Sequence, residues 1–227
     1  NASKDKFFSI IAHDLRSPFS SLLSFSEFLI EDIEELSKED IKSFSEKIHE
    51  SAKNVFTLLE NLLQWSRVQS GKIPYQPSNF NISFKINQVI SLLTNNATNK
   101  KIKIVNDVSS HAIVFADEDM VFSVIQNLLS NAIKFTNEGG TIVFRSLIKV
   151  SSIDISISDN GVGIKEADLQ KLFSLDAHHT TYGTKEEKGS GLGLILCKEM
   201  VERNRGKIFA ESKVGEGTTF TFSLPKV

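Results

Sequence analysis

The sequence predicts an α+β protein, in which an all-α helical hairpin precedes an α/β sandwich. In the first part, apolar residues recur at alternating spacings of three and four, as in coiled-coil helices. The second part mixes helical periods with the strict alternation of strands. Half of the four prolines fall within residues 71–81, which predicts a break between the parts. We therefore expect a hairpin over 1–72, a linker over 73–81 and the sandwich over 82–227.

The composition excludes several classes of function. Lys and Arg total 26 against 28 Asp and Glu, so no chain-wide basic field favours nucleic acid. The single cysteine, Cys197, excludes internal disulfides and cysteine-rich zinc sites and fits a reducing compartment. No apolar run approaches the roughly 20 residues of a membrane span. Because the chain begins at Asn1, we expect an excised part of a longer protein, which could include a membrane anchor.

Two amphipathic helices are predicted for the hairpin. The apolar seam of the first contains Phe8, Ile11, Leu15, Pro18, Leu22, Phe25 and Leu29. The seam of the second contains Ile41, Phe44, Ile48, Ser51, Val55, Leu58, Leu62 and Trp65. Between them, Ser37 and Asp40 form a Ser-x-x-Asp helix-start signal. Further apolar residues lie beside both seams, and a four-helix bundle made by dimerisation would cover them.

His13 is predicted on the solvent face of the first helix, because it lies two residues, or roughly 200°, beyond the seam position Ile11. It could be an ordinary surface histidine. Alternatively, Asp14 could accept a hydrogen bond from the ring and make it more nucleophilic, and Arg16 suits an incoming phosphate. Pro18 leaves a helical carbonyl without its donor, so we expect a bent or loosened helix there, unless the helix starts at Pro18.

The elements of the second part follow from its periods. We expect helices over 82–96, 119–136 and 191–204, and strands over 102–108, 112–116, 141–150, 152–159, 206–212 and 218–224. On the helix 119–136, Asn127, Asn131 and Lys134 lie within roughly 60° of one another, opposite an apolar stripe. An amide oxygen can ligate Mg²⁺ and an ammonium can pair with phosphate. An ordinary solvated face is the alternative.

Two glycine-rich runs follow. Asp159, at a strand end before Gly161 and Gly163, marks either a tight turn or a carboxylate aimed at a ligand. A second run precedes a helix, where main-chain amides can bind an anion, and contains Gly189, Gly191 and Gly193. Between the runs, residues 174–190 are almost devoid of apolar side chains, which indicates a mobile lid. His178 and His179 have no carboxylate or cysteine at a convincing metal-ligand spacing.

In this order, the segments resemble the kinase core of a bacterial two-component sensor histidine kinase. FFSIIAHDLRSP is similar to the H-box, NLLSNAIKFT to the N-box, DNGVGI and GSGLGL to the two glycine boxes, KLF to the F-box and GEGTTFTFSLP to the closing strand motif. The resemblance covers nearly the whole chain. It implies a GHKL-type ATP-binding domain over residues 82–227.

The resemblance also implies roles for individual residues. His13 would be the phosphoacceptor and Asp14 its activating neighbour, with Arg16 and Ser17 beside them. Asn131 would ligate Mg²⁺. The other implied nucleotide-site residues are Asn127 and Lys134 near the phosphates, Phe135 beside the adenine, Asp159 on the adenine amino group, Gly161 and Gly163 at a lid hinge, Phe173 as a lid anchor, Gly189, Gly191 and Gly193 along the triphosphate, and Thr218 in the closing strand motif.

The implied activity is ATP-dependent autophosphorylation of His13 in a homodimer, followed by transfer to an aspartate of a response regulator receiver domain. Ser17 departs from the Thr or Asn of many relatives that dephosphorylate their partner, although a serine hydroxyl could still position a water. The alternatives are a nucleotide-binding scaffold that has lost phosphorylation and a GHKL ATPase that drives clamp closure. The histidine-bearing hairpin argues against the second, and the absence of H-R-D and D-F-G motifs argues against a Ser/Thr-type kinase.

Overall fold

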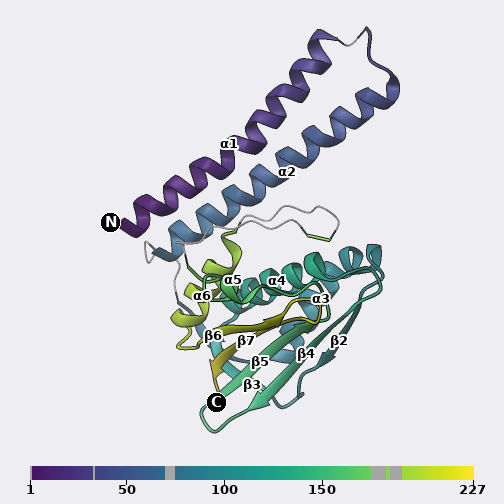
Figure 1. Ribbon diagram of the computed structural model, residues 1–227. Coiled ribbons are helices and arrows are strands. Elements are labelled where there is room, and N and C mark those ends of the chain that lie inside the picture. The colour runs from purple at the N-terminus through teal and green to yellow at the C-terminus, as the bar shows by residue number, and fades with distance from the viewer. Residues whose placement is uncertain (1, 33, 70–74, 175–182, 185–190) are drawn as a thin grey trace. The chain divides into compact units, whose positions relative to one another are not determined.

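The computed structural model describes residues 2–32, 34–69, 75–174, 183–184 and 191–227. The chain forms two compact units, Asn1–Ser70 and Gly71–Val227. Figure 1 shows the helical first unit in purple and blue and the mixed second unit in teal to yellow. The predicted α+β class is confirmed. Among the described residues, no helix combines the length and the apolar character needed to cross a membrane.

The first unit is an antiparallel helical hairpin of α1 (Ala2–Glu31) and α2 (Lys38–Gln69) (Figure 1). Every seam residue whose burial is described is buried or half-buried, as the apolar period predicted. The Phe44 ring packs 5.6 Å from the Phe25 ring and 5.8 Å from the Phe28 ring, measured between centroids. Because α1 continues through Pro18, the alternative that the helix begins there is wrong.

The start of α2 is a reciprocal capping box. Ser37 Oγ accepts a hydrogen bond from the main-chain N–H of Asp40 at 3.1 Å and donates to Asp40 Oδ2 at 2.6 Å. The main-chain N–H of Ser37 also donates to this carboxylate, at 3.3 Å. These bonds satisfy amides that would otherwise be unpaired at the helix end, which explains why the break falls where the Ser-x-x-Asp signal predicted it.

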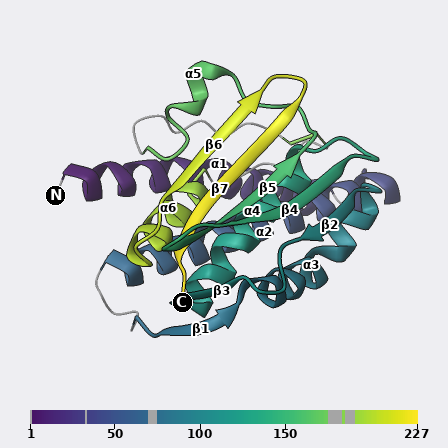
Figure 2. The same ribbon diagram turned by 90° about the horizontal axis from the view of Figure 1, so that it is seen from below.

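The second unit is built on a five-stranded sheet with the order β2-β4-β5-β7-β6. Its strands are β2 (Lys103–Asp107), β4 (Thr141–Ile148), β5 (Ser152–Asp159), β6 (Ile208–Lys213) and β7 (Gly217–Pro225). Neighbours are antiparallel except β2 and β4, which are parallel. Three helices, α3 (Ile82–Asn99), α4 (Glu118–Phe135) and α6 (Gly193–Arg203), cover one face of the sheet, as Figure 1 and Figure 2 show. A four-residue helix, α5 (Glu166–Leu169), contacts β6.

Alternation along β5 decides which side chains face the helices. Ile153, Ile155 and Ile157 are buried, whereas Asp154 and Ser156 between them are half-buried. Ile157 lies opposite Phe220 of β7 in the core layer. Two residues further along, the same period places Asp159 on this helix-covered face, at the end of the strand.

One expectation was wrong. Part of the expected linker, Pro77–Asn81, forms strand β1, which pairs in antiparallel register with β3 (Ile113–Asp117). Pro77 occupies the first position of this two-stranded ribbon, where the missing N–H is tolerated. The segment is polar and proline-rich, so its own sequence predicts no strand, and the pairing with β3 is what makes it one. The other predicted elements are present, with ends shifted by a few residues.

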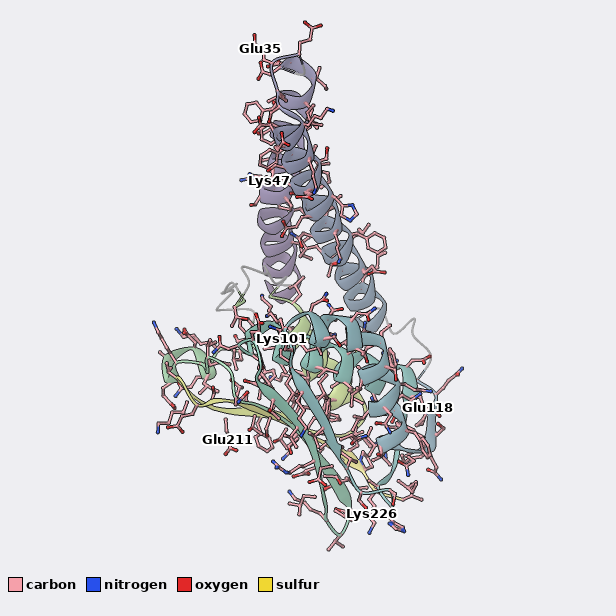
Figure 3. The ribbon with its side chains drawn as sticks, turned by 90° about the vertical axis from the view of Figure 1, so that its right-hand side faces the viewer. Glu35, Lys47, Lys101, Glu118, Glu211 and Lys226 are labelled. Carbon is pink, nitrogen blue, oxygen red and sulfur yellow. The ribbon has the colours of Figure 1, made fainter. Side chains whose placement is uncertain are left out.

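Helices α3 and α4 run in the same direction and are connected at both ends. At the amino ends, Lys85 Nζ lies 2.8 Å from Glu118 Oε2. At the carboxyl ends, Lys100 Nζ donates to the main-chain oxygen of Ile133 at 3.0 Å. Figure 3 labels Lys101, which follows α3, and Glu118, the first residue of α4, at opposite ends of this pair. The two helices therefore form one connected layer over the sheet.

Candidate functional site

Helix α4 has the two faces that its sequence predicted. Val121, Val124, Leu128 and Ala132 are buried, with exposed fractions of 2% or less. Asn127, Asn131 and Lys134 are half-buried on the other face. The Asp117 side chain caps the helix by accepting a hydrogen bond from the N–H of Met120 at 3.1 Å. The polar face is sheltered by its surroundings, which argues against an ordinary solvated surface.

The amino end of α6 approaches this polar face. A Cβ atom added to Gly193 would lie 2.9 Å from Asn127 Oδ1, so the start of α6 and the Asn127 side chain are close neighbours. Side chains of Asn81 and Asp117 cap α3 and α4, but α6 begins after Leu192, which has no side-chain acceptor. The main-chain amides of the first turn of α6 could bind an anion next to Asn127.

The carboxylate of Asp159 lies at the end of β5, at the edge of the core. Its Oδ1 accepts a hydrogen bond from the N–H of Gly161 at 2.9 Å, and the main chain of Thr218 also donates to the carboxylate. Burial raises the pKa of Asp159 above its ordinary value, although both hydrogen bonds act in the opposite direction. Thr218 in turn shares a 2.9 Å hydroxyl–hydroxyl hydrogen bond with Ser212. A half-buried carboxylate with a perturbed pKa at a strand end is typical of a functional site.

Gly161 and Gly163 both allow close approach of main chains within the protein. A side chain at Gly161 would collide with the main-chain oxygen of Phe135, to which the N–H of Val162 donates at 3.1 Å. Gly163 has a φ of +70°, and a side chain there would collide with the main-chain oxygen of Lys213. The turn after Asp159 is therefore pressed against the carboxyl end of α4, the helix that carries the polar face.

Aromatic residues complete this region. Lys134 Nζ lies 4.7 Å from the centroid of the Phe135 ring, and both side chains are half-buried. Phe173 packs edge-on against Phe220 of β7, with the ring centroids 6.4 Å apart. Phe173 thus lies against the sheet core, next to the short helix α5.

Other predicted residues lie elsewhere. His13, Asp14, Arg16 and Ser17 lie on α1 in the first compact unit. Arg16 and Ser17 are exposed, whereas the side chains of His13 and Asp14 lie outside the described residues. Gly191 is exposed with a φ of +66°. Gly189, His178, His179 and most of the expected lid also lie outside the described residues.

Three further residues shape this region and carry little signal in the sequence. Gly217 has a φ of +117°, and a side chain there would collide with the main-chain oxygen of Asp159. The only sequence signal was a glycine directly before the closing strand. Lys100 and Thr184 bind the carboxyl end of α4. They stand in a lysine-rich run and a polar segment, where neither residue is distinguishable from a surface residue.

The site suits a metal cation whose coordinating atoms come mostly from a bound molecule and from water, with few from the protein. Within the part of the chain that the structure describes, no group of three or more His, Cys, Asp or Glu residues is placed to hold a metal ion. Mg²⁺ in nucleotide sites usually takes only one or two protein ligands, together with phosphate oxygens and water. The half-buried amide of Asn131, on the polar face of α4, meets that requirement.

Two family models match this chain. One, described as the His Kinase A (phospho-acceptor) domain, matches residues 3–71. The other, described as Histidine kinase-, DNA gyrase B-, and HSP90-like ATPase, matches residues 116–227. Together they cover most of the chain, one in each part of the sequence.

Curated proteins and solved structures agree with these matches. The circadian input-output histidine kinase CikA of Synechococcus elongatus is 32% identical over 100% of this chain and 30% of CikA. The nucleotide-free catalytic domain of the histidine kinase ThkA is 28% identical, with a TM-score of 0.58 over 66% of this chain and 97% of that domain. ThkA in complex with the response regulator protein TrrA gives a TM-score of 0.78 over 97% of this chain and 61% of that chain, and its 24% identity shows the fold alone. The chain spans between 19% and 59% of the length of curated relatives that it matches.

Proposed function

The chain belongs to the histidine kinases, and from this premise we propose that it is a kinase core that transfers the γ-phosphoryl group of ATP to His13. The hairpin Asn1–Ser70 would carry the phosphoacceptor, and the unit Gly71–Val227 would bind the nucleotide. The observation that carries the proposal is the presence, in one chain, of a phosphoacceptor-type hairpin and an ATPase-type unit. A GHKL ATPase that drives clamp closure would not need that hairpin.

The geometry around α4 supports the binding of a nucleoside triphosphate. Asp159, at the inward end of β5, can accept a hydrogen bond from an amino group such as that of adenine. Lys134 offers positive charge to the phosphates, and the first turn of α6 offers main-chain amides. Asn131 would hold Mg²⁺, which neutralises phosphate charge when bound. Asn127, beside Gly193, would lie between these groups.

In the proposed reaction, a ring nitrogen of His13 attacks the γ-phosphorus of ATP. The new N–P bond forms as the bond from the γ-phosphorus to the bridging oxygen breaks, and ADP leaves. Asp14 would accept a hydrogen bond from the other ring nitrogen and so stabilise the developing positive charge on the ring. Arg16, on the exposed surface of α1, would pair with the transferred phosphoryl group.

The phosphoryl group would then pass to an aspartate of a receiver domain on a response regulator. Support comes from the structural neighbour ThkA, which was solved in complex with a response regulator protein. The exposed position of Arg16 and Ser17 on α1 leaves room for such a partner at this helix.

The location of the core follows from its substrate. Because ATP is a cytoplasmic substrate and Cys197 is a free thiol, we propose that the core lies in the cytoplasm.

We infer that the hairpin is completed by a second copy of this chain. Among the hairpin residues whose burial is described, seven large apolar ones are at least 46% exposed: Phe19, Leu23, Phe28, Ile30, Phe56, Leu59 and Leu63. A pair of helices cannot bury this much apolar surface, whereas a four-helix bundle can. Leu23→Glu would place a charge in that interface and should shift the chain towards monomer in sedimentation experiments. A monomeric parent chain would contradict the inference.

Incubation with γ-labelled ATP tests the central proposal. The parent chain and His13→Gln are treated with labelled ATP, with Mg²⁺ or with excess chelator, and the protein-bound label is then exposed to acid and to base. We expect label that is acid-labile, base-stable, dependent on Mg²⁺ and absent from His13→Gln. Absence of label in a parent chain that still binds nucleotide would favour the scaffold alternative. Addition of a receiver domain should then remove the label from His13.

A further inference from the structure

The last turn of α4 receives hydrogen bonds from several distant parts of the chain. The last four carbonyl groups of a helix have no partner within it and need donors from elsewhere. The Ala132 oxygen accepts from the N–H and Oγ1 of Thr136, the Ile133 oxygen accepts from Lys100 Nζ, and the Phe135 oxygen accepts from the N–H of Val162. The Lys134 oxygen accepts from Lys100 Nζ at 2.9 Å and from the N–H of Thr184 at 3.1 Å.

Lys100 is a buried cation, with an exposed fraction of 3%. Its Nζ lies within 3.0 Å of three oxygens, those of Ile133, Lys134 and the Thr184 hydroxyl, which matches the three donors of an ammonium group. The negative end of the α4 dipole favours a positive charge at this place. Lys100 is itself held at the C-cap of α3, where the N–H of Ile102 donates to the Ala97 oxygen.

Thr184 contacts the same turn with both its main chain and its side chain. Its hydroxyl accepts from Lys100 Nζ at 2.8 Å and lies 3.2 Å from the Lys134 oxygen and 3.0 Å from the Thr136 oxygen, either of which it can donate to. These contacts join residues 48 to 84 positions apart in the chain. Thr184 is half-buried there.

We propose that Lys100 and Thr184 are positioning residues for the nucleotide site, acting through the last turn of α4. Lys134 and Phe135 belong to that turn, so fixing its carbonyl groups also fixes the directions of the side chains that would meet the phosphates and the adenine. This inference rests on the proposed function. Removing the Thr184 hydroxyl leaves Lys100 Nζ and one carbonyl with fewer partners, and the turn then has to relax.

Thr184→Val tests the role of the hydroxyl, because valine keeps the shape and the main-chain N–H but not the Oγ1 donor. Thr184→Ser restores the hydroxyl. The matched control is Thr94→Val, since Thr94 Oγ1 donates only to the Ile90 oxygen on the exposed side of α3. For each full chain, the Kd for ADP with Mg²⁺ is measured by calorimetry, and the Tm is measured without nucleotide.

We expect the Kd of Thr184→Val to rise roughly tenfold, the scale of one lost hydrogen bond to a charged group. Thr184→Ser and Thr94→Val should stay within about twofold of the parent. In a Lys100→Met background, Thr184→Val should add less than it does alone, because both residues bind the same turn. A parent-like Kd in Thr184→Val, an equal loss in Thr184→Ser, or a lowered Tm with unchanged Kd would each overturn the inference.

Failure of the proposed function would appear differently. Nucleotide binding is measured apart from phosphoryl transfer, so a parent chain that binds ADP but leaves His13 unlabelled counts only against the kinase reaction. A labelled parent together with parent-like binding in Thr184→Val counts only against the positioning role.

Discussion

The Cα atom of Gly161 lies so close to the main-chain oxygen of Phe135 that no side chain fits between them. This contact, with the 3.1 Å hydrogen bond from the N–H of Val162 to the same oxygen, joins the turn after β5 to the end of α4. It joins the strand end that carries Asp159 to the helix end that carries Lys134 and Phe135. The packing of two main chains therefore controls the geometry of the site.

Gly161→Ala should disrupt this junction. The added methyl group meets main-chain atoms that cannot rotate away, so we expect the free energy of unfolding to fall by about 1–3 kcal/mol. Nucleotide affinity should also fall as the turn moves away from α4. Gly215→Ala is the control, since Gly215 has a φ of +81° but nothing within 4 Å of an added Cβ. Gly215→Ala should cost about 1 kcal/mol of backbone strain and leave ADP binding unchanged. Equal ADP affinity in Gly161→Ala and Gly215→Ala would contradict the role assigned to the contact between Gly161 and Phe135.

Asp159→Asn should separate stability from binding. The pKa of Asp159 in the folded chain lies above its ordinary value of 3.8, so the folded state binds a proton more tightly than the unfolded state does. The free energy of unfolding therefore decreases as pH rises through the folded pKa. At neutral pH the ionised carboxylate destabilises the folded chain to its full extent. Asparagine removes this cost.

The nucleotide-free Asp159→Asn chain should accordingly be more stable than the parent at neutral pH, and the difference should shrink as pH falls towards 3.8. Urea unfolding across a pH series measures this trend. Affinity for ADP should fall at least about tenfold, because a charged acceptor is lost. A variant that is less stable than the parent at neutral pH would show that the Asp159 carboxylate stabilises the fold.

Ser37→Ala should weaken the start of α2. The substitution removes the hydroxyl that exchanges hydrogen bonds with Asp40, and loss of such a cap costs about 1 kcal/mol. Thermal unfolding followed by circular dichroism measures the effect. Ser45→Ala is the comparison, because Ser45 Oγ donates only to the Ile41 oxygen on the exposed helix surface. The capping role would be refuted by equal Tm values for the two variants.

Arg205→Gly should stabilise the second unit. Arg205 has a φ of 60° just after α6, where the N–H of Gly206 donates to the Val201 oxygen in a helix-ending turn. Glycine relieves the strain of the left-handed conformation but also increases the conformational entropy of the unfolded chain. The net effect should be a rise in the free energy of unfolding of about 0.5–1 kcal/mol. Tm should rise by a few degrees. Arg205→Ala keeps the strain and should show no gain; an equal rise in both would point to loss of the arginine charge instead.

Much of the fold could be predicted because its signals are local. The Ser37 and Asp40 cap involves residues three apart, and the burial of Ile153, Ile155 and Ile157 follows the period of a strand. The polar face of α4 follows in the same way from the helical period. Strand β1 was missed because its pairing partner, β3, lies more than thirty residues further along the chain.

The spacing of residue types in the sequence was enough by itself to predict the hairpin, most helices and strands, and the polar face of α4. It also singled out Asp159 and the glycines that follow it. Only the tertiary structure decided that Gly161 must fit against Phe135, that Asp159 is buried enough for its pKa to rise, and that Lys100 and Thr184 bind the end of α4. The physical reason is the range of the interactions. Helical and strand periods depend on neighbours a few residues away, whereas burial and the satisfaction of helix-end carbonyl groups depend on segments that meet only after the chain has folded.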